Sequence, residues 1–384
     1  MLITTSSALS EFCAALRGAP YIAVDTEFMR EKSYYAYLCL IQVAYGEHAA
    51  AIDPLAKDLD MTPLWELLRD PGVVKVFHAA GQDLEIFHTI FKEVPGPVFD
   101  TQIAASVCGL GEQPGYAKLV SSLLGVDIDK SSQATDWSLR PLTDRQLSYA
   151  LSDVTHLCVL YEKLLAKLSE TKRTSWVSQE MAGLLDASRY VVEPSEAWRR
   201  VRTRRPKRRT LAVLRELAKW REEEAMSRDI PRGWLLRNEA MIEIAQGIPK
   251  DVAALSRVRG LKHHVARGED GRAILSAVER ALASTESDWP PLPPPRPPKM
   301  DRGPLVALLN ALLQQRCREN DVSTGMIARR GDLEEIAAGR EDVAALKGWR
   351  RTIFGEDALE LCAGRLALTG ENGEVIDGEV VEGE

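Results

Sequence analysis

Short apolar runs bounded by polar residues recur along residues 1 to about 165, and this pattern predicts β-strands. The runs at 21–25, 37–45 and 48–52 follow one another so closely that an antiparallel meander is expected. A fourth run, at 73–77, precedes a segment with helical periodicity at 82–91. Adjacent strands followed by strands that alternate with helices predict a mixed sheet flanked by helices.

Capping residues indicate where the predicted helices begin. Thr62 and Asp100 are expected to cap two short helices, because a side-chain oxygen at that position accepts a hydrogen bond from a free backbone amide. Thr143, followed three residues later by Gln146, forms a capping box. The helix that it starts is expected to run to about residue 168, since no Gly or Pro interrupts it.

Strands are not predicted beyond about residue 190. Two helical blocks follow, and the sequence Asp-Val-Ala-Ala-Leu occurs in both, at 251–255 and 342–346, which indicates a duplicated helical domain. The Pro-rich segment between the blocks favours an extended, semi-rigid spacer. The sequence thus predicts a multidomain protein with an α/β domain (1–190), a basic linker (191–206), a first all-α domain (207–285), the Pro-rich linker (286–300), a second all-α domain (301–370) and an acidic, disordered tail (371–384).

The overall composition, with 45% hydrophobic and 27% charged residues, is typical of a soluble globular protein. No stretch approaches the roughly 18 apolar residues of a transmembrane helix, and the N-terminus has no basic segment followed by an apolar run. The six cysteines are scattered and include no CxxC pair, which argues against a disulfide framework and a zinc knuckle. We therefore expect a cytoplasmic monomer without membrane association.

Charge is distributed unevenly around the net value of −7, because residues 199–209 hold eight cations in eleven positions. This basic run has two interpretations, a solvated linker or a segment that binds nucleic-acid phosphates without sequence preference. Trp220 follows it as a candidate for base stacking. The cations proposed to contact nucleic acid are Arg204, Arg205, Lys207, Arg208 and Arg209.

Four acids fall at strand ends or on helices of the first predicted domain. Asp25 and Glu27 are two residues apart on the first strand, so their carboxylates point the same way. Two such charges are unfavourable side by side unless a cation lies between them. Asp83 begins the helix after the fourth strand, and Asp153 lies on the long helix. Hard oxygen ligands of this kind suit Mg²⁺ or Mn²⁺ rather than zinc.

A pair of divalent ions about 3.5–4 Å apart can activate a water and stabilise the leaving oxygen of a phosphodiester. Tyr149 lies four residues before Asp153 on the same helix face, where its hydroxyl is placed to orient that water. Each acid alone also has a structural interpretation: Asp83 is favoured by the helix dipole and Asp153 is a solvated acid. His78 is interpreted as a buried strand-end histidine rather than a ligand.

Three short motifs of this chain resemble those of the DnaQ-like 3′→5′ exonucleases: Val24-Asp-Thr-Glu-Phe28, His78-Ala-Ala-Gly-Gln-Asp-Leu-Glu85 and Tyr149-x-x-x-Asp153. The tyrosine of the third motif is typical of the tyrosine-type branch. Within the superfamily the chain resembles the ribonuclease D family, and the two helical blocks resemble its paired HRDC-type domains. The second block is the more divergent, since Gln315-Arg316 stands where the first has Trp220-Arg221.

The resemblance implies a ribonuclease H-like fold for the first domain and two divalent metal ions held by Asp25, Glu27, Asp83 and Asp153. Tyr149 would position the water, and Phe28 would lie against the terminal base. The implied activity is metal-dependent hydrolysis of RNA from its 3′ end to 5′-mononucleotides. The implied substrates are tRNA precursors or other structured RNA with a single-stranded 3′ tail.

Two alternatives remain at this stage. A DNA-directed 3′→5′ exonuclease shares the same set of metal ligands, but no polymerase-like region follows the first domain. A non-catalytic RNA-binding module with a decayed site would be expected to lack a ligand, and none of the four acids is missing.

Overall fold

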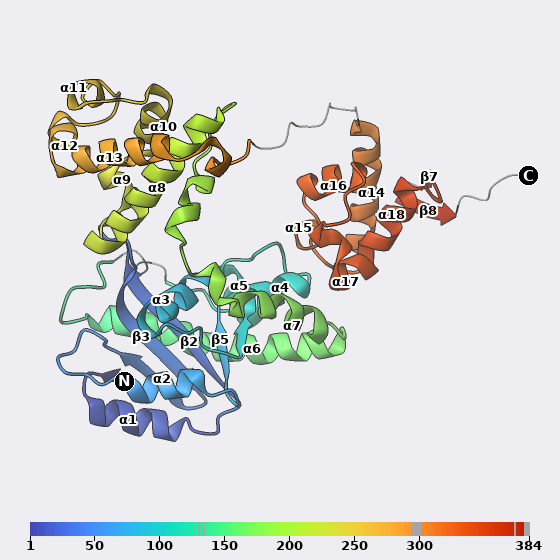
Figure 1. Cartoon of the computed structure of the whole chain (residues 1–384). Coiled ribbons are helices and arrows are strands. Elements are labelled where there is room, and N and C mark those ends of the chain that lie inside the picture. The colour runs from blue at the N-terminus through green and yellow to red at the C-terminus, as the bar shows by residue number, and fades with distance from the viewer. Residues whose placement is uncertain (130, 132, 134, 293–301, 372–373, 380–384) are drawn as a thin grey trace, which may run out of the picture.

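The computed structural model describes residues 1–129, 131, 133, 135–292, 302–371 and 374–379. An α/β domain occupies the first half of the chain, and the two helical blocks lie against different parts of it (Figure 1). No helix within these described ranges is both long and apolar enough to cross a membrane.

A six-stranded mixed sheet forms the centre of the first domain, with the order β1-β4-β3-β2-β5-β6. Strands β2, β3 and β4 pair antiparallel, which confirms the predicted meander, whereas β2–β5, β5–β6 and β1–β4 pair parallel. The two shortest strands were not predicted, because runs of two or three residues show no periodicity. The strands are β1 (Leu2–Ile3), β2 (Tyr21–Met29), β3 (Tyr37–Tyr45), β4 (His48–Ile52), β5 (Val74–Phe77) and β6 (Val98–Asp100).

Helices cover both faces of this sheet, as predicted. In Figure 1, α6 passes behind the sheet and α2 and α3 lie in front of it. Helix α6 packs directly on β2, β3 and β4 through buried residues such as Val154 and Leu157. The helices of this domain are α1 (Ser6–Ala15), α2 (Thr62–Arg69), α3 (Gly81–Phe91), α4 (Thr101–Val107), α5 (Tyr116–Leu124), α6 (Asp144–Glu170) and α7 (Thr174–Ala182), followed by the 3-10 turns η2 (Gly183–Leu185) and η3 (Ala187–Arg189).

Two of the three predicted helix caps are confirmed. The Asp100 carboxylate accepts hydrogen bonds from the first amides of α4, and Thr143 and Gln146 form the reciprocal capping box of α6. The prediction for Thr62 is wrong by one residue. Thr62 is itself the first residue of α2, and no side chain in the described part of the chain caps this helix. The Thr62 amide donates to Oδ1 of Asp60, which precedes the helix.

The first helical block begins earlier than predicted. Residues Pro194–Arg200 form a 3-10 helix, η4, and Ala197 and Val201 are buried in the same core as α8. The segment 191–206 therefore belongs partly to the block and is not only a linker. The remaining elements are α8 (Arg208–Arg228), α9 (Arg232–Leu235), α10 (Asn238–Gly247), α11 (Val252–Leu255), α12 (His263–Arg267), α13 (Glu269–Ala283) and η5 (Glu286–Asp288).

The second helical block repeats the order of the first, since a long helix is followed by a one-turn helix, a middle helix and a short turn. Residues 293–300 of the predicted Pro-rich linker, and residue 301, lie outside the described residues. The elements are α14 (Gly303–Glu319), α15 (Thr324–Ile327), α16 (Arg330–Ala337), η6 (Ala344–Leu346), α17 (Gly348–Arg350), the π-turn η7 (Arg351–Gly355) and α18 (Glu356–Cys362).

A β-hairpin follows α18 and corrects two predictions. Strands β7 (Leu366–Glu371) and β8 (Glu374–Glu379) pair antiparallel, so strands do occur beyond residue 190. The first half of the tail predicted to be disordered is thus an ordered strand, because Arg316 of α14 binds the carboxylate of Asp377 at 2.7 Å. Residues 380–384 of that tail lie outside the described residues.

Both helical blocks contact the α/β domain through specific side chains. The Tyr34 hydroxyl donates a 2.5 Å hydrogen bond to Glu222 of α8, and Asp229 accepts from the amides of Tyr34 and Tyr35. On the other side, Trp349 of the second block stacks on Trp176 of α7 with ring centroids 4.6 Å apart. Each block therefore contacts the domain that carries the acids.

Candidate active site

The acids on β2 lie just beyond the fully buried first part of this central strand, which continues to Met29 instead of ending near Asp25 as predicted. Asp25 and Glu27 follow the fully buried residues Ile22, Ala23 and Val24, and the pairing register of β2 with β3 shifts between Glu27 and Phe28. Such an irregularity changes the direction of the strand and of the side chains beyond it. The sequence pattern thus places two carboxylates at the rim of the sheet and redirects Phe28 next to them.

Three of the four predicted ligands come together in space. Carboxylate oxygens of Asp25, Glu27 and Asp153 all lie within 4.8 Å of one another, with Asp153 supplied by α6 where it crosses behind β2. Oδ1 of Asp153 is buried and has no hydrogen-bond partner among the described residues. Carboxylate oxygens this close, one of them unsatisfied, are the donor set that a hard divalent cation requires.

Asp83 stands apart from this cluster. It lies in the first turn of α3, as predicted, and is buried, but its Oδ1 accepts a 2.5 Å hydrogen bond from the Thr26 hydroxyl. The cluster of mutually close carboxylates in the described residues does not include it. The charge of the cluster nevertheless affects Asp83. Burial, followed by the charge of Asp25, raises the pKa of Asp83 well above the ordinary value for aspartate.

The electrostatics of the cluster are strongly unfavourable to ionisation without a cation. Burial raises the pKa of Asp25 to about 6. Burial, followed by the charge of Asp25, raises the pKa of Asp153 to about 7, and burial together with all three neighbouring acids raises the pKa of Glu27 to about 9. Desolvation and like-charge repulsion both favour the neutral acid. A bound divalent ion would reverse this preference.

Tyr149 lies beside the cluster, one turn before Asp153 on α6. Its hydroxyl lies near the Asp153 carboxylate, and this neighbour opposes the effect of burial on the pKa of that acid. Burial and the nearby carboxylates raise the pKa of Tyr149 far above that of free tyrosine, so the phenol keeps its proton. A neutral hydroxyl at this point can orient a water but cannot act as a strong base.

Comparisons with known proteins extend the resemblance to the whole chain. Residues 1–169 match the 3′-5′ exonuclease family model and residues 210–278 the HRDC domain model. A ribonuclease D of Sphingobium indicum is 46% identical over 375 residues, which cover 97% of this chain and 97% of the relative. The chain belongs to the ribonuclease D family. It is a 3′→5′ exoribonuclease, a hydrolase that acts on RNA and depends on divalent metal ions.

Other members of the ribonuclease D family agree with this assignment. The ribonuclease D of Gluconacetobacter diazotrophicus is 45% identical over 374 residues, covering 96% of this chain and 94% of the relative. The crystal structure of Escherichia coli RNase D, described as an exoribonuclease involved in structured RNA processing, matches with a TM-score of 0.83 and 33% identity. That match covers 95% of this chain and 98% of the other.

Several residues that support this ribonuclease D site were not singled out as site residues in the sequence analysis. Asp100, beyond capping α4, accepts hydrogen bonds from the amides of Ala79 and Ala80 and so holds the turn that leads into α3. Trp137 is buried beside the Tyr149 ring, with centroids 6.2 Å apart. Both contacts join segments far apart in the chain, which a residue pattern does not reveal.

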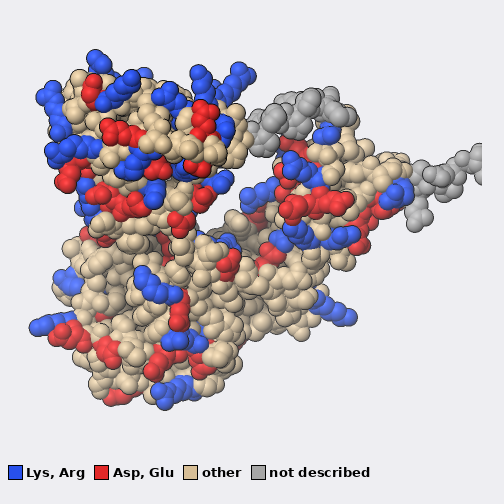
Figure 2. All heavy atoms as spheres, viewed as in Figure 1, with Lys and Arg blue, Asp and Glu red and all other residues tan. Residues whose placement is uncertain are grey.

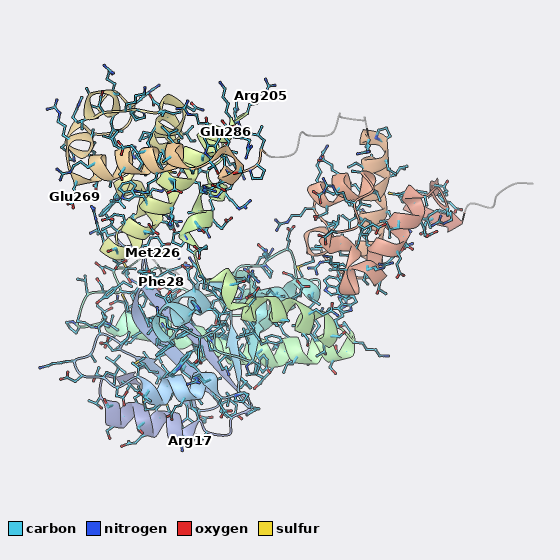
Figure 3. All side chains as sticks on the ribbon, in the orientation of Figure 1. Arg17, Phe28, Arg205, Met226, Glu269 and Glu286 are labelled. Atoms are coloured by element: carbon cyan, nitrogen blue, oxygen red, sulfur yellow. The ribbon has the colours of Figure 1, made fainter. Side chains whose placement is uncertain are left out.

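The residues predicted to contact nucleic acid lie in different environments. Phe28 is half-buried at the boundary between the α/β domain and the first helical block, below Met226 of α8 (Figure 3). Arg205 lies on the far side of that block, away from Phe28 (Figure 3). The side chains of four predicted contacts are exposed: Arg204, Arg205, Lys207 and Arg209. Lys and Arg side chains also gather along the outer rim of the first helical block (Figure 2).

Two of these predictions need correction. Trp220 is only 8% exposed and packs in the core of the first block, so its ring is not available for stacking on a base. Arg208 donates hydrogen bonds to the backbone oxygens of Glu286 and Trp289 and thereby ties the start of α8 to the end of the block. Trp220 lies three and seven residues after the apolar Leu217 and Val213, a helical spacing that favours the core over an exposed stacking position.

Proposed function

We propose that Asp25, Glu27, Asp83 and Asp153 hold two divalent metal ions, Mg²⁺ or Mn²⁺, at which RNA is hydrolysed from its 3′ end. The observation that carries this proposal is the approach of three carboxylates to within 4.8 Å, with Oδ1 of Asp153 buried and unpartnered in the described residues. Oxygen ligands from a strand and a helix suit these ions, and no cysteine or histidine belongs to the cluster.

The remaining ligand is Asp83. Thr26 occupies its Oδ1, which fixes the orientation of the carboxylate and leaves Oδ2 for the metal site. Asp83 follows the turn that Asp100 holds, so its position depends on the bonds that the Asp100 carboxylate accepts from the amides of Ala79 and Ala80. We expect Asp83 to complete the four-carboxylate set.

Divalent ions bound here supply an acidified water and stabilise the leaving oxygen of the phosphodiester. The protein side chains then have positioning roles. The Tyr149 ring lies beside Trp137, and its hydroxyl, near Asp153, orients the water for attack on the phosphorus atom. Phe28 lies against the terminal base and keeps the last nucleotide in the site. Release of a 5′-mononucleotide follows from cleavage at the terminal linkage.

The substrate that we propose is structured RNA with a single-stranded 3′ tail, tRNA precursors in particular. Two helical blocks beside a site that accepts an RNA end are suited to holding the folded part while the tail enters. We also propose that the enzyme acts as a monomer in the cytoplasm, a reducing compartment that suits its six free cysteines.

Matched RNA and DNA oligonucleotides, labelled at the 5′ end and incubated with Mg²⁺, test this function. A ladder that shortens from the 3′ end on RNA, and not on DNA, is the expected result, and it should disappear in Asp25→Asn. Equal degradation of DNA would favour a DNA-directed exonuclease. Unchanged activity of Asp25→Asn would overturn the catalytic assignment, whereas RNA binding without any cleavage by the unmutated chain would favour a binding module.

A further inference from the structure

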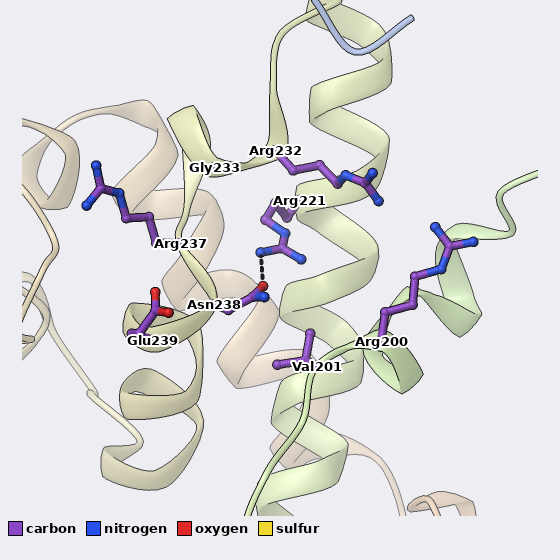
Figure 4. Close-up of a pocket in the computed structure, with 8 residues that line it drawn as sticks. All are labelled: Arg200, Val201, Arg221, Arg232, Gly233, Arg237, Asn238 and Glu239. Carbon is purple, nitrogen blue, oxygen red and sulfur yellow. Dashed lines mark hydrogen bonds between the residues drawn. The ribbon is translucent and has the colours of Figure 1, made fainter. Parts of the chain in front are cut away.

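A second polar cavity lies in the first helical block, away from the carboxylates. It has a volume of about 320 Å³, and its lining combines four arginines with a single acid (Figure 4). The side chains come from the end of η4, from α8, from α9 and from the start of α10. The lining residues are Arg200, Val201, Arg221, Arg232, Gly233, Arg237, Asn238 and Glu239.

Arg221 forms the floor of this cavity. Its side chain is only 6% exposed, and Nη1 donates to the backbone oxygen of Leu236 at 2.9 Å and to Oδ1 of Asn238 at 2.8 Å. Its Nε is buried without a partner among the described residues. A guanidinium remains charged in proteins, and a buried charge without a partner is costly. The residue is therefore held in place with part of its donor capacity unused.

The other arginines surround this floor. Arg200 and Arg237 are exposed, and neither forms an ion pair within the described residues. Arg232 donates to Glu222 at 3.2 Å, and its guanidinium lies 5.4 Å from the centre of the Tyr34 ring. In Figure 4, Arg200 and Arg232 lie on one side of Arg221 and Arg237 on the other. The cavity is thus positive, and Arg232 connects it to the α/β domain.

The second helical block provides an internal comparison. Asp229 and Asp321 follow the long helices α8 and α14 with similar positive φ angles, 47° and 45°, and α9 and α15 both begin three residues later. This offset of 92 residues puts Leu313, not the predicted counterpart Arg316, at the position that Arg221 occupies in α8. The second block therefore has no arginine at this position. In the first block, Arg221 meets a backbone oxygen and an amide rather than carboxylates, so its charge is left available for an anion from outside the block.

We propose that this cavity is a binding site for a backbone phosphate of the RNA, resting on the exoribonuclease function proposed above. Arginine binds phosphate through two parallel N–H donors, and the four arginines that line this cavity offer such donors to a phosphodiester. Glu222 and Arg232 join the wall of the cavity to Tyr34, which follows the strand that carries Phe28. A phosphate held here anchors the RNA body while its 3′ end occupies the carboxylate site.

The test uses the full-length chain and the paired variant Arg200→Gln/Arg237→Gln, which changes only exposed side chains. The matched control, Arg257→Gln/Arg259→Gln, removes two exposed arginines of the same block that do not line the cavity. Binding of an RNA hairpin with a 3′ tail is measured by fluorescence anisotropy in EDTA at several salt concentrations. Hydrolysis of a short unstructured RNA is measured in Mg²⁺.

We expect the cavity variant to bind the hairpin roughly tenfold more weakly than the unmutated chain. The slope of log affinity against log salt concentration should fall in magnitude by about one to two. The control variant should match the unmutated chain in both affinity and slope. Hydrolysis of the short RNA should be unchanged in both. If the control variant loses as much RNA affinity as the cavity variant, the RNA binds a diffuse basic surface and not this cavity. If the cavity variant binds RNA as tightly as the unmutated chain, the proposal is wrong. Because binding is measured without metal, this outcome is independent of whether Asp25→Asn abolishes cleavage.

Discussion

The Thr26 hydroxyl donates a 2.5 Å hydrogen bond to Oδ1 of Asp83 and so joins the central strand to the first turn of α3. Both side chains are buried, at 6% and 7% exposure. Thr26, which lies between the proposed ligands Asp25 and Glu27, therefore orients the carboxylate of a third proposed ligand, Asp83. Partners of this kind fix the direction of a ligand oxygen and are often as important as the ligand itself.

Replacing Thr26 with valine should test this relationship, because the shape is kept and only the hydroxyl is lost. We expect the rate of RNA hydrolysis at saturating Mg²⁺ to fall about 10–100-fold, the usual cost of losing such an orienting hydrogen bond. Thr26→Ser keeps the donor and should retain most of the activity. Equal rates in the two variants would show that the bond to Asp83 has no role in the site.

Tyr149→Phe should separate positioning from binding. The variant loses the hydroxyl beside Asp153 but keeps all four carboxylates, so metal and RNA affinity should be preserved while hydrolysis slows by roughly 10²-fold. Single-turnover rates and Mn²⁺ titrations of this variant are compared with those of Asp153→Asn. A loss of metal affinity as large as that of Asp153→Asn would contradict the water-orienting role.

The raised pKa values of the site predict how metal-free stability depends on pH. Asp25, Asp153 and Glu27 have pKa values of about 6, 7 and 9 in the folded chain, whereas free carboxyl groups ionise near pH 4. Between about pH 4 and each raised pKa, the folded state holds protons that the unfolded state has lost. Stability of the metal-free protein should therefore fall as pH rises through this window.

Glu27→Gln removes the group with the highest of these pKa values. At pH 8, in EDTA, the α/β domain of this variant should melt about 2–4 °C above that of the unmutated chain, and the difference should vanish near pH 4. Adding Mg²⁺ should stabilise the unmutated chain more at pH 8 than at pH 6, because fewer protons must be displaced. Glu47→Gln, an exposed acid outside the site, is the control and should show no pH-dependent change.

The contact between Tyr34 and Glu222 should be measurable as a domain-docking energy. Glu222 is fully buried, and Tyr34→Phe removes the hydroxyl that donates to it at 2.5 Å. Leaving this carboxylate with one donor fewer should cost about 1–3 kcal/mol in urea unfolding of the first helical block. Tyr35→Phe is the matched control, since Tyr35 is an exposed neighbour on the same loop. Equal unfolding midpoints for both variants would argue that the contact does not stabilise docking.

Much of the first domain could be predicted from the sequence, because its signals are local. The boundaries of β3 and β4, the Asp100 cap and the capping box of α6 depend on neighbouring residues, and the structure has them as predicted. Strand periodicity indicates that Asp25 and Glu27 share a face, whereas their gathering with Asp153 was implied by the resemblance of the three motifs.

What could not be predicted depends on distances between elements. Periodicity places Asp83 at a helix start but does not tell that Thr26 binds it. The tail from Glu374 is rich in acids, which by composition favours disorder, yet Arg316 lies opposite and offsets that charge in the folded chain. Trp220 was assigned to base stacking because its aromatic ring was weighed above its helical spacing from Val213 and Leu217, which favours the core of the block.

The ion pairs of Arg316 have a consequence for the charge that the second helical block presents. Asp377 comes from the hairpin β7–β8 and binds Arg316 together with Glu319 and Asp357. The protein thus places its own carboxylates where a polyanion would otherwise compete for the guanidinium. At this arginine the chain serves as its own counter-ion.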